Sequence, residues 1–404
     1  MATLGGKDTG GMNVYVRELS KQLGRIGVGV DVFTRSQDEH VPHVVHDLGY
    51  GNRVIHVPAG PEEPLPKKEL AVFFQDFVQY VLEFAEQKIV QSDLLHTHYW
   101  MSGIVGKDLK AEWDVPMVHM FHTLGLMKNR IAREGEFEGD YRIKGEREVL
   151  RHADKIIAAT QAELAQLQWL YEVRTDNVVI IPPGVDVNHF YPIAKEDARE
   201  YIGAEEKSKI LLFVGRIEPL KGVDTLIRGM ALMKRSGVFD RQNVCLAIIG
   251  GDASMSEENM SQEMARLHEI RNQNNLEDLV TFLGKRSQDT LPYYYSAADV
   301  LVMPSHYESF GMVALEAMAC GTPVVASQVG GLAYLIQDGV TGFHVRDQDP
   351  EELSRRLTEI LENDALHEAL SKNAAKYAKG YSWKVVTDQI KLVYQSLIEK
   401  ERVN

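Results

Sequence analysis

The chain has 404 residues, 44% of them apolar and 25% charged, and a net charge of −14, which suits two globular domains better than one. The acidic balance argues against nucleic acid as a partner, although a few local Arg and Lys side chains are enough to bind a phosphate ligand. No apolar run reaches the ~20 residues of a transmembrane helix, no signal-peptide pattern opens the chain, and Cys245 and Cys320 are the only cysteines, so we expect a cytoplasmic protein with two buried free thiols.

Short β-branched runs alternate with longer amphipathic stretches along the chain, which predicts parallel sheets covered by helices on both faces. Helical patterns occur over 12–26, 68–87 and 224–233, and a final helix is expected over 381–398. The predicted strands are 30–33, 53–57, 94–96, 116–121, 155–159 and 178–181 in the first half, and 209–214, 244–249, 280–283, 300–303, 323–326 and 342–345 in the second.

The alternation begins again after a proline-rich segment that ends at Pro192. We therefore predict an N-terminal Rossmann-like domain (1–192), a C-terminal Rossmann-like domain (193–380) and a terminal helix (381–404). The fold class is α/β, with two doubly wound domains in tandem. Ligands are expected in a cleft between the domains, at the C-terminal ends of the strands.

Two carboxylates, Glu308 and Glu316, bracket the start of a predicted helix that Gly311 opens. Free backbone N–H groups and the positive end of the helix dipole suit a diphosphate at that point. Eight residues at helical rise span at most about 12 Å, close to the separation of the hexose and ribose in a nucleotide-sugar. A solvated loop Glu and an ion-paired helix Glu are the alternative, but the strand–loop–helix context favours a donor site.

Arg216 and Lys221 follow another predicted strand and therefore lie at the same kind of sheet edge. Two cations there can neutralise a diphosphate leaving group. Cations at strand ends are often only solvated, so this prediction depends on its combination with the segment from Glu308 to Glu316.

The first half of the chain carries weaker signals. Gly10-Gly11 opens a helix and suits either a phosphate or only a turn, and His122 follows a strand, where it can hydrogen-bond a sugar hydroxyl or be purely structural. The sequence has no Walker A loop, no HExxH and no zinc-type cysteine spacing. The DxD letters at Asp347 to Asp349 precede Pro350 and predict a helix N-cap, so no metal ion and no cofactor is expected.

Together these motifs and the IPPGVD linker resemble the retaining glycosyltransferases of family 4, which have the GT-B fold, over nearly the whole chain. The resemblance implies transfer of a hexosyl unit, glucose or N-acetylglucosamine, from a UDP-sugar to a phosphorylated polyol or sugar such as inositol phosphate. It further implies retention at the anomeric carbon, no metal requirement, and a final helix that returns to the N-terminal domain.

The resemblance also implies roles for individual residues. Catalysis would involve His122, Glu308, Arg216 and Lys221, with the two cations on the departing diphosphate. The donor would contact Gly11, Arg216, Lys221, Arg286, Glu308, Ser309, Phe310, Gly311, Met312, Val313 and Glu316, with Glu316 on the ribose and Glu308 on the transferred sugar. The acceptor would contact Asp8, Gly10, Gly11, Asn13, Lys67, Tyr99, Thr123 and Arg142.

One departure from the family concerns the start of the chain. Relatives begin with an apolar strand before the ATLGG segment, whereas this sequence begins at Met1-Ala2-Thr3. We therefore expect the first, central strand of the N-terminal sheet and its acceptor-side histidine to be missing, which would leave backbone groups unpaired.

Four alternatives remain open at this point. The acceptor can be fructose 6-phosphate, giving sucrose 6-phosphate, or a lipid or glycan. The protein can also bind nucleotide-sugars without turnover, because of the missing strand, or act as an epimerase on UDP-GlcNAc. Whether the chain forms a homodimer is not determined by the sequence.

Overall fold

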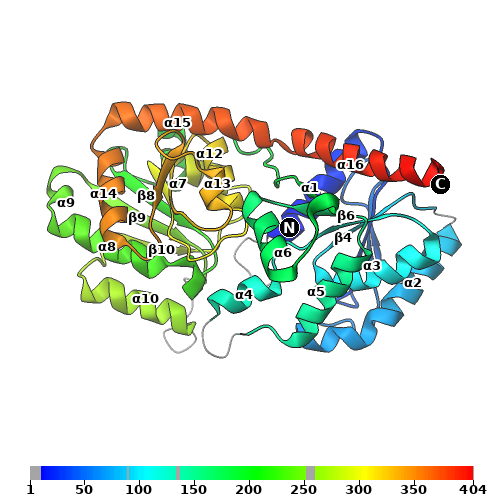
Figure 1. The fold of residues 1–404 in the computed structure, drawn as a ribbon. Coiled ribbons are helices and arrows are strands. Elements are labelled where there is room, and N and C mark those ends of the chain that lie inside the picture. The colour runs from blue at the N-terminus through cyan, green and yellow to red at the C-terminus, as the bar shows by residue number, and fades with distance from the viewer. Residues whose placement is uncertain (1–10, 89–90, 133–136, 252–259, 404) are drawn as a thin grey trace. The chain divides into compact units, whose positions relative to one another are not determined.

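The computed structural model describes residues 11–88, 91–132, 137–251 and 260–403 (Figure 1). Its internal contacts divide the chain into two compact units. Of the described residues, the C-terminal unit takes Gly11 and Pro183–Ser382, and the N-terminal unit takes Met12–Pro182 and the helix that begins at Trp383.

The division falls after Pro182, ten residues before the predicted boundary at Pro192. The reason lies in the proline-rich segment itself, which packs on the C-terminal unit. The backbone N–H of Val185 donates to the carbonyl of Tyr381 at 2.8 Å, and the buried Phe190 lies against Tyr295 with ring centroids 6.0 Å apart. The terminal helix likewise begins at Trp383 rather than at residue 381.

The C-terminal unit contains one six-stranded parallel sheet in the order β10-β9-β8-β11-β12-β13. Its strands are apolar runs because helices cover both faces of such a sheet. They are β8 (Lys209–Val214), β9 (Val244–Ile249), β10 (Val280–Gly284), β11 (Val300–Met303), β12 (Val324–Ser327) and β13 (Gly342–Val345).

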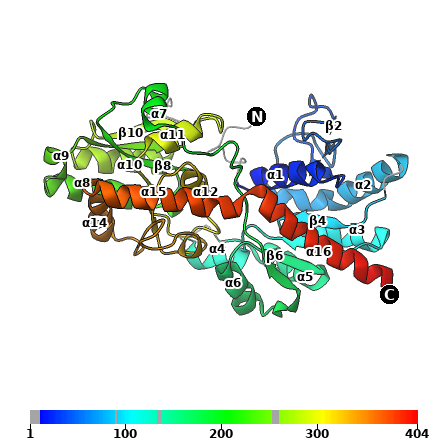
Figure 2. The same cartoon turned by 90° about the horizontal axis from the view of Figure 1, so that it is seen from above.

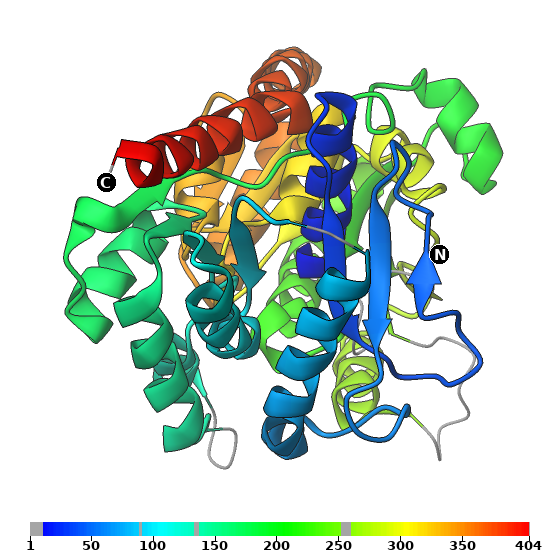
Figure 3. The same cartoon turned by 90° about the vertical axis from the view of Figure 1, so that its right-hand side faces the viewer.

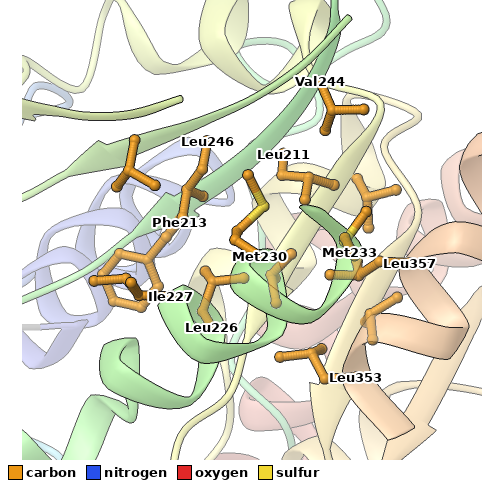
Figure 4. Packing of buried hydrophobic residues seen from close by; sticks show 14 of the residues in the cluster. Leu211, Phe213, Leu226, Ile227, Met230, Met233, Val244, Leu246, Leu353 and Leu357 are labelled. Atoms are coloured by element: carbon orange, nitrogen blue, oxygen red, sulfur yellow. The ribbon is translucent and has the colours of Figure 1, made fainter. Parts of the chain in front are cut away.

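Helix α8 (Val223–Arg235) shows how these helices attach to the sheet. Its apolar side chains at Leu226, Ile227, Met230 and Met233 follow the helical period and are all fully buried. They pack against Leu211 and other side chains of one continuous core (Figure 4). The other helices of this unit are α7 (Lys195–Ile202), α9 (Val238–Arg241), α10 (Gln262–Gln273), α11 (Leu291–Ala297), α12 (Met312–Ala319), α13 (Leu332–Leu335), α14 (Pro350–Leu361) and α15 (Asp364–Ala378), with 3-10 turns at Pro219–Lys221 and Lys379–Tyr381.

The described strands of the N-terminal unit form two separate sheets. The first has the order β1-β3-β2 and the second the order β4-β5-β6-β7, and Figure 3 shows the blue strands of the first and the cyan-to-green strands of the second as two groups. The strands are β1 (Asp31–Arg35), β2 (Val44–Val45), β3 (Arg53–Val57), β4 (Leu95–His98), β5 (Met117–Met120), β6 (Lys155–Ala158) and β7 (Val178–Ile180).

The long C-terminal helix belongs to this unit and packs on β4 through Tyr394, whose hydroxyl lies 2.6 Å from Nδ1 of His96 (Figure 2, helix in red). The helices here are α1 (Gly11–Arg25), α2 (Phe74–Lys88), α3 (Trp100–Trp113), α4 (Gly125–Ile131), α5 (Asp140–His152), α6 (Gln161–Tyr171) and α16 (Trp383–Val403), with 3-10 turns at Lys67–Phe73 and Thr175–Asn177.

A cavity of about 1330 Å³ lies between the two sheets of the N-terminal unit. Consecutive residues line it over 29–35, around β1, and over 91–98, around β4. A strand presents only alternate residues on one face, so consecutive lining residues show that the cavity runs along the edges of both strands. Helix α1 contributes Leu19 and Leu23 to its wall, and α16 contributes Tyr394 and Ile398.

The strand predictions are confirmed, with ends displaced by at most two residues. Among the strands of the described residues, β2, of two residues, was the one not predicted, and the helix predicted over 68–87 begins as a 3-10 turn at Lys67. Asp349 is the predicted N-cap, since its side chain accepts from the backbone N–H of Glu352 at 2.9 Å. Both cysteines are free, but Cys245 is only partly buried. The expected missing strand concerns the start of the chain, where Met1 to Gly10 lie outside the described residues.

Candidate functional site

The loops after β8 and β11 meet because these strands are parallel neighbours, with Leu301 opposite Leu212. The first loop carries Lys221 and the second carries Glu308. Nζ of Lys221 donates to Oε2 of Glu308 at 2.5 Å, and both side chains are less than one-fifth exposed. The structure thus brings together two of the predicted catalytic residues within the C-terminal unit.

Glycine is required where these two loops touch. Gly222 has a φ of +63° and follows Lys221, and a Cβ at this position would lie 2.0 Å from the carbonyl oxygen of Pro304. Any side chain would push the loops apart. The close approach therefore holds Lys221 beside the end of β11.

Arg216 lies on the same loop but does not join the Lys221 ion pair. Its guanidinium is 2.8 Å from Oε1 of Glu218, and the side chain is about half exposed, at 47%. Arg216 therefore remains accessible to a ligand at the sheet edge, whereas Lys221 is already paired with Glu308.

The segment from Glu308 to Gly311 is held by a second glycine contact. The backbone N–H of Gly331 donates to the carbonyl of Glu308 at 2.8 Å, and a Cβ on Gly330 would lie 2.0 Å from that same oxygen. Gly311 caps α12 with a φ of +104°, as expected for the residue that opens this helix. Of the other predicted donor residues here, Phe310 is buried, and half-buried positions are held by Ser309, Met312 and Val313.

Glu316 is buried one turn into α12, where the hydroxyl of Tyr295 donates to its Oε2 at 2.8 Å. Burial raises the pKa of the Glu316 carboxyl to about 7. A buried carboxyl with a single hydroxyl partner keeps acceptor capacity for a diol. Arg286, predicted to bind the base through its backbone, donates from Nε to the hydroxyl of Tyr294 at 2.8 Å.

In the N-terminal unit, β4 and β5 are parallel neighbours, with His98 opposite Met120. Tyr99 directly follows β4 with φ +74° and ψ +149°, and His122 follows β5 with φ +60°. Both are non-glycine residues in backbone conformations that cost of order 1–3 kcal/mol each. Such strain at the ends of adjacent strands marks this edge as a candidate site.

The predicted acceptor residues gather around the ring of Tyr99. Arg142 lies with Cζ 5.1 Å from the ring centroid, and Nζ of Lys67 lies 5.4 Å from it. Arg142 also donates from Nη2 to the hydroxyl of Thr123 at 3.0 Å and to its carbonyl at 2.9 Å. Four of the predicted acceptor residues therefore form one cluster, with two cations on one aromatic ring.

Two glutamates that the sequence analysis missed hold Arg142 in place. Nε donates to Glu146 at 2.8 Å and Nη1 donates to Glu138 at 2.6 Å. Burial opposes the charge of Arg142, but Glu146 and Glu138 outweigh it and raise the pKa of the guanidinium. The spacing of four residues from Arg142 to Glu146 is the usual spacing of helical ion pairs and was the available signal, whereas Glu138 precedes α5.

His122 lies in a group of histidines in which His119 is fully buried and His98 and His122 are half-buried. Its Nε2 is 3.0 Å from Nδ1 of His98, and Tyr15 packs edge-on against its ring at 5.3 Å. Burial, with smaller effects from His98 and His119, lowers the pKa of His122 well below its usual value. A neutral imidazole can exchange hydrogen bonds with a sugar hydroxyl but supplies no charge. Within the described ranges, no group of three or more His, Cys, Asp or Glu side chains is arranged to hold a metal ion.

The remaining predicted residues lie at the start of the chain. Gly11 and Asn13 fall in the first turn of α1, while Asp8 and Gly10 lie outside the described residues. In the described part of the chain, no helix has the length and apolarity needed to span a membrane.

Comparison with known families matches both halves of the chain. Residues 9–189 match the family described as Glycosyltransferase Family 4, and residues 194–377 match Glycosyl transferases group 1. The D-inositol 3-phosphate glycosyltransferase of Thermomonospora curvata is 39% identical over 98% of this chain and 92% of its own length.

Solved structures agree with this match. The sucrose-phosphate synthase of Thermosynechococcus elongatus superposes with a TM-score of 0.88 and 33% identity, covering 99% of this chain and 96% of that one. The Anabaena HepE protein in complex with UDP and glucose has a TM-score of 0.75 at 22% identity, covering 97% and 98% of the two chains, and supports the fold alone.

The parallel α/β architecture and the two matched domains define a GT-B glycosyltransferase, so the chain is an enzyme of sugar transfer. Within that class it belongs to glycosyltransferase family 4, as its near full-length similarity to the Thermomonospora enzyme shows.

Proposed function

We propose that this enzyme transfers a glucosyl or N-acetylglucosaminyl unit from a UDP-sugar to a phosphorylated polyol or sugar, inositol phosphate first among them. The observation that carries the acceptor class is the cluster of Lys67, Tyr99, Thr123 and Arg142, two cations and a hydroxyl around one aromatic ring. The name of the 39% identical relative supports inositol phosphate as the acceptor.

The donor is assigned to the C-terminal unit. Arg216 and Lys221 supply two cations at the sheet edge for the diphosphate, beside the N-terminus of α12. Glu316 binds the ribose hydroxyls. Glu308 binds the transferred sugar after its ion pair with Lys221 has opened. Gly11, Arg286 and the backbone from Ser309 to Val313 complete the proposed donor contacts.

We propose retention through attack on the same face that the diphosphate leaves. The acceptor oxygen bonds to the anomeric carbon as the bond from that carbon to the β-phosphate oxygen breaks, and the acceptor's proton passes to the departing β-phosphate. The main electrostatic task is then to stabilise the diphosphate, which Arg216 and Lys221 perform without a metal ion. His122, neutral through burial, positions a sugar hydroxyl.

Fructose 6-phosphate is the alternative acceptor. It is supported by the TM-score of 0.88 with a protein named sucrose-phosphate synthase. Its phosphate would use the same cationic cluster, so the two candidates differ in what binds beyond the phosphate.

A panel of substrates tests these proposals. Purified protein is incubated with UDP-[14C]glucose or UDP-[14C]GlcNAc and with inositol phosphate, fructose 6-phosphate or their unphosphorylated forms. We expect labelled product with inositol phosphate and little with either unphosphorylated compound. Product with fructose 6-phosphate alone would establish the alternative, and label transferred equally to unphosphorylated inositol would contradict a phosphate-binding role for the cluster.

Two further measurements address the finer claims. The anomeric coupling constant of the product by NMR should match that of the donor if the configuration is retained. Turnover should be unchanged after treatment with EDTA if no metal ion takes part. We also propose a cytoplasmic location, supported by the two free thiols, which cell fractionation would test.

A further inference from the structure

Glu138 places one carboxylate oxygen between two cations of the N-terminal unit. Its Oε1 accepts from Nη1 of Arg142 at 2.6 Å and from Nζ of Lys128 at 2.9 Å. Its backbone is held on both sides by Asn129, which donates to the Glu138 carbonyl at 3.0 Å and accepts from its N–H at 2.6 Å. The backbone is thus anchored while the side chain projects toward the cations.

The two glutamates that bind Arg142 differ in how easily they can be replaced. Glu146 is fully buried and also accepts from the backbone N–H of Gly125 at 2.9 Å and from the hydroxyl of Tyr171. The Glu138 side chain is 27% exposed, and within the described ranges it accepts hydrogen bonds from the two cations, Lys128 and Arg142. Breaking the Glu146 contacts would strand buried polar groups, whereas Glu138 can turn out into water.

The two cations that Glu138 bridges identify what would take its place. With Glu138 turned away, Lys128 and Arg142 each lose one carboxylate contact, while Arg142 keeps its contact with Glu146. A phosphate monoester, which is largely a dianion above pH ~6, offers three acceptor oxygens to these two cations.

We propose that Glu138 is an internal counter-ion that occupies the acceptor's anion subsite in the unliganded protein and is displaced by the phosphate of the acceptor. This inference rests on the proposed function for the identity of the anion. An internal competitor weakens every ligand that must displace it by the same factor, because only the fraction of molecules with Glu138 turned away can bind. Weakly held monoanions then fail to occupy the subsite, whereas a dianion held by two cations still does.

Small anions test this without any need for turnover. Binding of methyl phosphate and of methyl sulfate, a dianion and a monoanion of similar shape, is measured by calorimetry at pH 8 for the wild type and for Glu138→Gln. We expect Glu138→Gln to lower the Kd of both anions by the same factor, at least about threefold. Glu138→Ala is the second variant and should behave alike.

A different outcome is expected if Glu138 stays in place and only repels the ligand. Coulomb energy scales with ligand charge. The logarithm of the ratio of the wild-type Kd to the Glu138→Gln Kd would then be about twice as large for methyl phosphate as for methyl sulfate. That result, or no tightening in either variant, would overturn the proposal.

Glu148→Gln is the matched control, since Glu148 lies on α5, the helix that carries Arg142, and pairs with a different lysine, Lys107, at 2.8 Å. It removes the same charge and should leave both affinities unchanged. If Glu148→Gln lowers both Kd values as much as Glu138→Gln does, the effect comes from net charge, and a specific role for Glu138 is contradicted.

Two combinations of results separate the counter-ion role of Glu138 from the choice of acceptor. If phosphorylated acceptors are glycosylated but Glu138→Gln binds anions as the wild type does, the counter-ion role alone is wrong. If no phosphorylated acceptor reacts but Glu138→Gln lowers the Kd of both anions by the same factor, Glu138 is the counter-ion of an anion subsite and the acceptor assignment is wrong.

Discussion

The two units share one strand–helix alternation but differ in how the strands pair. In the C-terminal unit, β8 has neighbours on both sides within one six-stranded sheet, while in the N-terminal unit the described strands form a three-stranded and a four-stranded sheet along a cavity of about 1330 Å³. The candidate donor residues are positioned by close backbone contacts at Gly222 and Gly330. The candidate acceptor residues are positioned by a side-chain network around Arg142. A site can thus be positioned by sheet geometry in one unit and by ion pairs in the other.

Leu211 and Leu19 provide the largest expected contrast between the units. Both are nearly inaccessible, at 0% and 3% exposed, but Leu211 lies in the packed core, whereas Leu19 lines the cavity. Truncation in a packed core creates a new void, so Leu211→Ala should lower the free energy of unfolding by about 2–5 kcal/mol. Leu19 already borders empty space, so Leu19→Ala should lower the free energy of unfolding by about 2 kcal/mol or less.

Urea unfolding can be followed separately for the two units. All four tryptophans belong to the N-terminal unit: Trp100, Trp113, Trp169 and Trp383. Tryptophan fluorescence therefore follows that unit, while far-UV circular dichroism follows both. An equal loss of stability for the two variants would mean that the wall of the cavity is as well packed as the core.

Lys221→Ala tests the donor half. Because Lys221 is one of the two cations proposed to stabilise the departing diphosphate, turnover should fall at least about tenfold with every acceptor. Steady-state release of UDP measures this, and Lys372→Ala, which removes an exposed lysine paired with Glu368, is the control. Near wild-type turnover would contradict the donor assignment.

Arg142→Lys tests the acceptor half with charge kept constant. A lysine cannot reproduce the contacts to Glu146, Glu138 and Thr123 at once. We expect the KM for the phosphorylated acceptor to rise about tenfold, equivalent to about 1.4 kcal/mol, with little change in UDP affinity by calorimetry. A parallel loss of UDP affinity would show that the two halves of the site are not energetically separate.

Glu316 provides the smallest effect, in the dependence of stability on pH. Its pKa is raised by burial to about 7 in the folded protein, from 4.5. The folded state therefore holds the proton more tightly than the unfolded state, and the stability that this proton provides is lost as pH rises from about 4.5 through 7.

Glu316→Gln stays neutral at every pH. Its melting temperature should nearly equal that of the wild type at pH 5 and exceed it by a few degrees at pH 8. Equal melting temperatures at pH 8 would mean that the carboxylate is ionised in the folded protein without penalty.

The sequence predicted the elements well because each has a local signal. The apolar run of β8 and the amphipathic period of α8 depend only on neighbouring residues, and both are confirmed. The side-by-side pairing of strands depends on contacts far apart in the chain. The hydrophobic periodicity of the sequence therefore could not show that β1 and β4 lie in separate sheets.

The candidate site shows the same division. The position of Lys221 and Glu308 on neighbouring loops followed from parallel strands, but their ion pair depends on a register that the motif does not contain. The partners of Arg142 were missed because acidic residues at helical spacing are common on solvated faces. Likewise, nothing in the sequence indicated that Tyr295 would donate to Glu316.

Tyr99 and His122 occupy backbone conformations that glycine adopts without steric strain. A chain selected for stability alone would place glycine at the ends of β4 and β5, since each strained residue costs of order 1–3 kcal/mol. Their presence implies that the N-terminal unit forgoes folding stability to hold an aromatic ring and an imidazole at fixed points on adjacent strands. Stabilising this enzyme by consensus or glycine substitution at that edge would thus trade activity for melting temperature, and engineering for thermostability is better directed at filling the cavity that Leu19 lines.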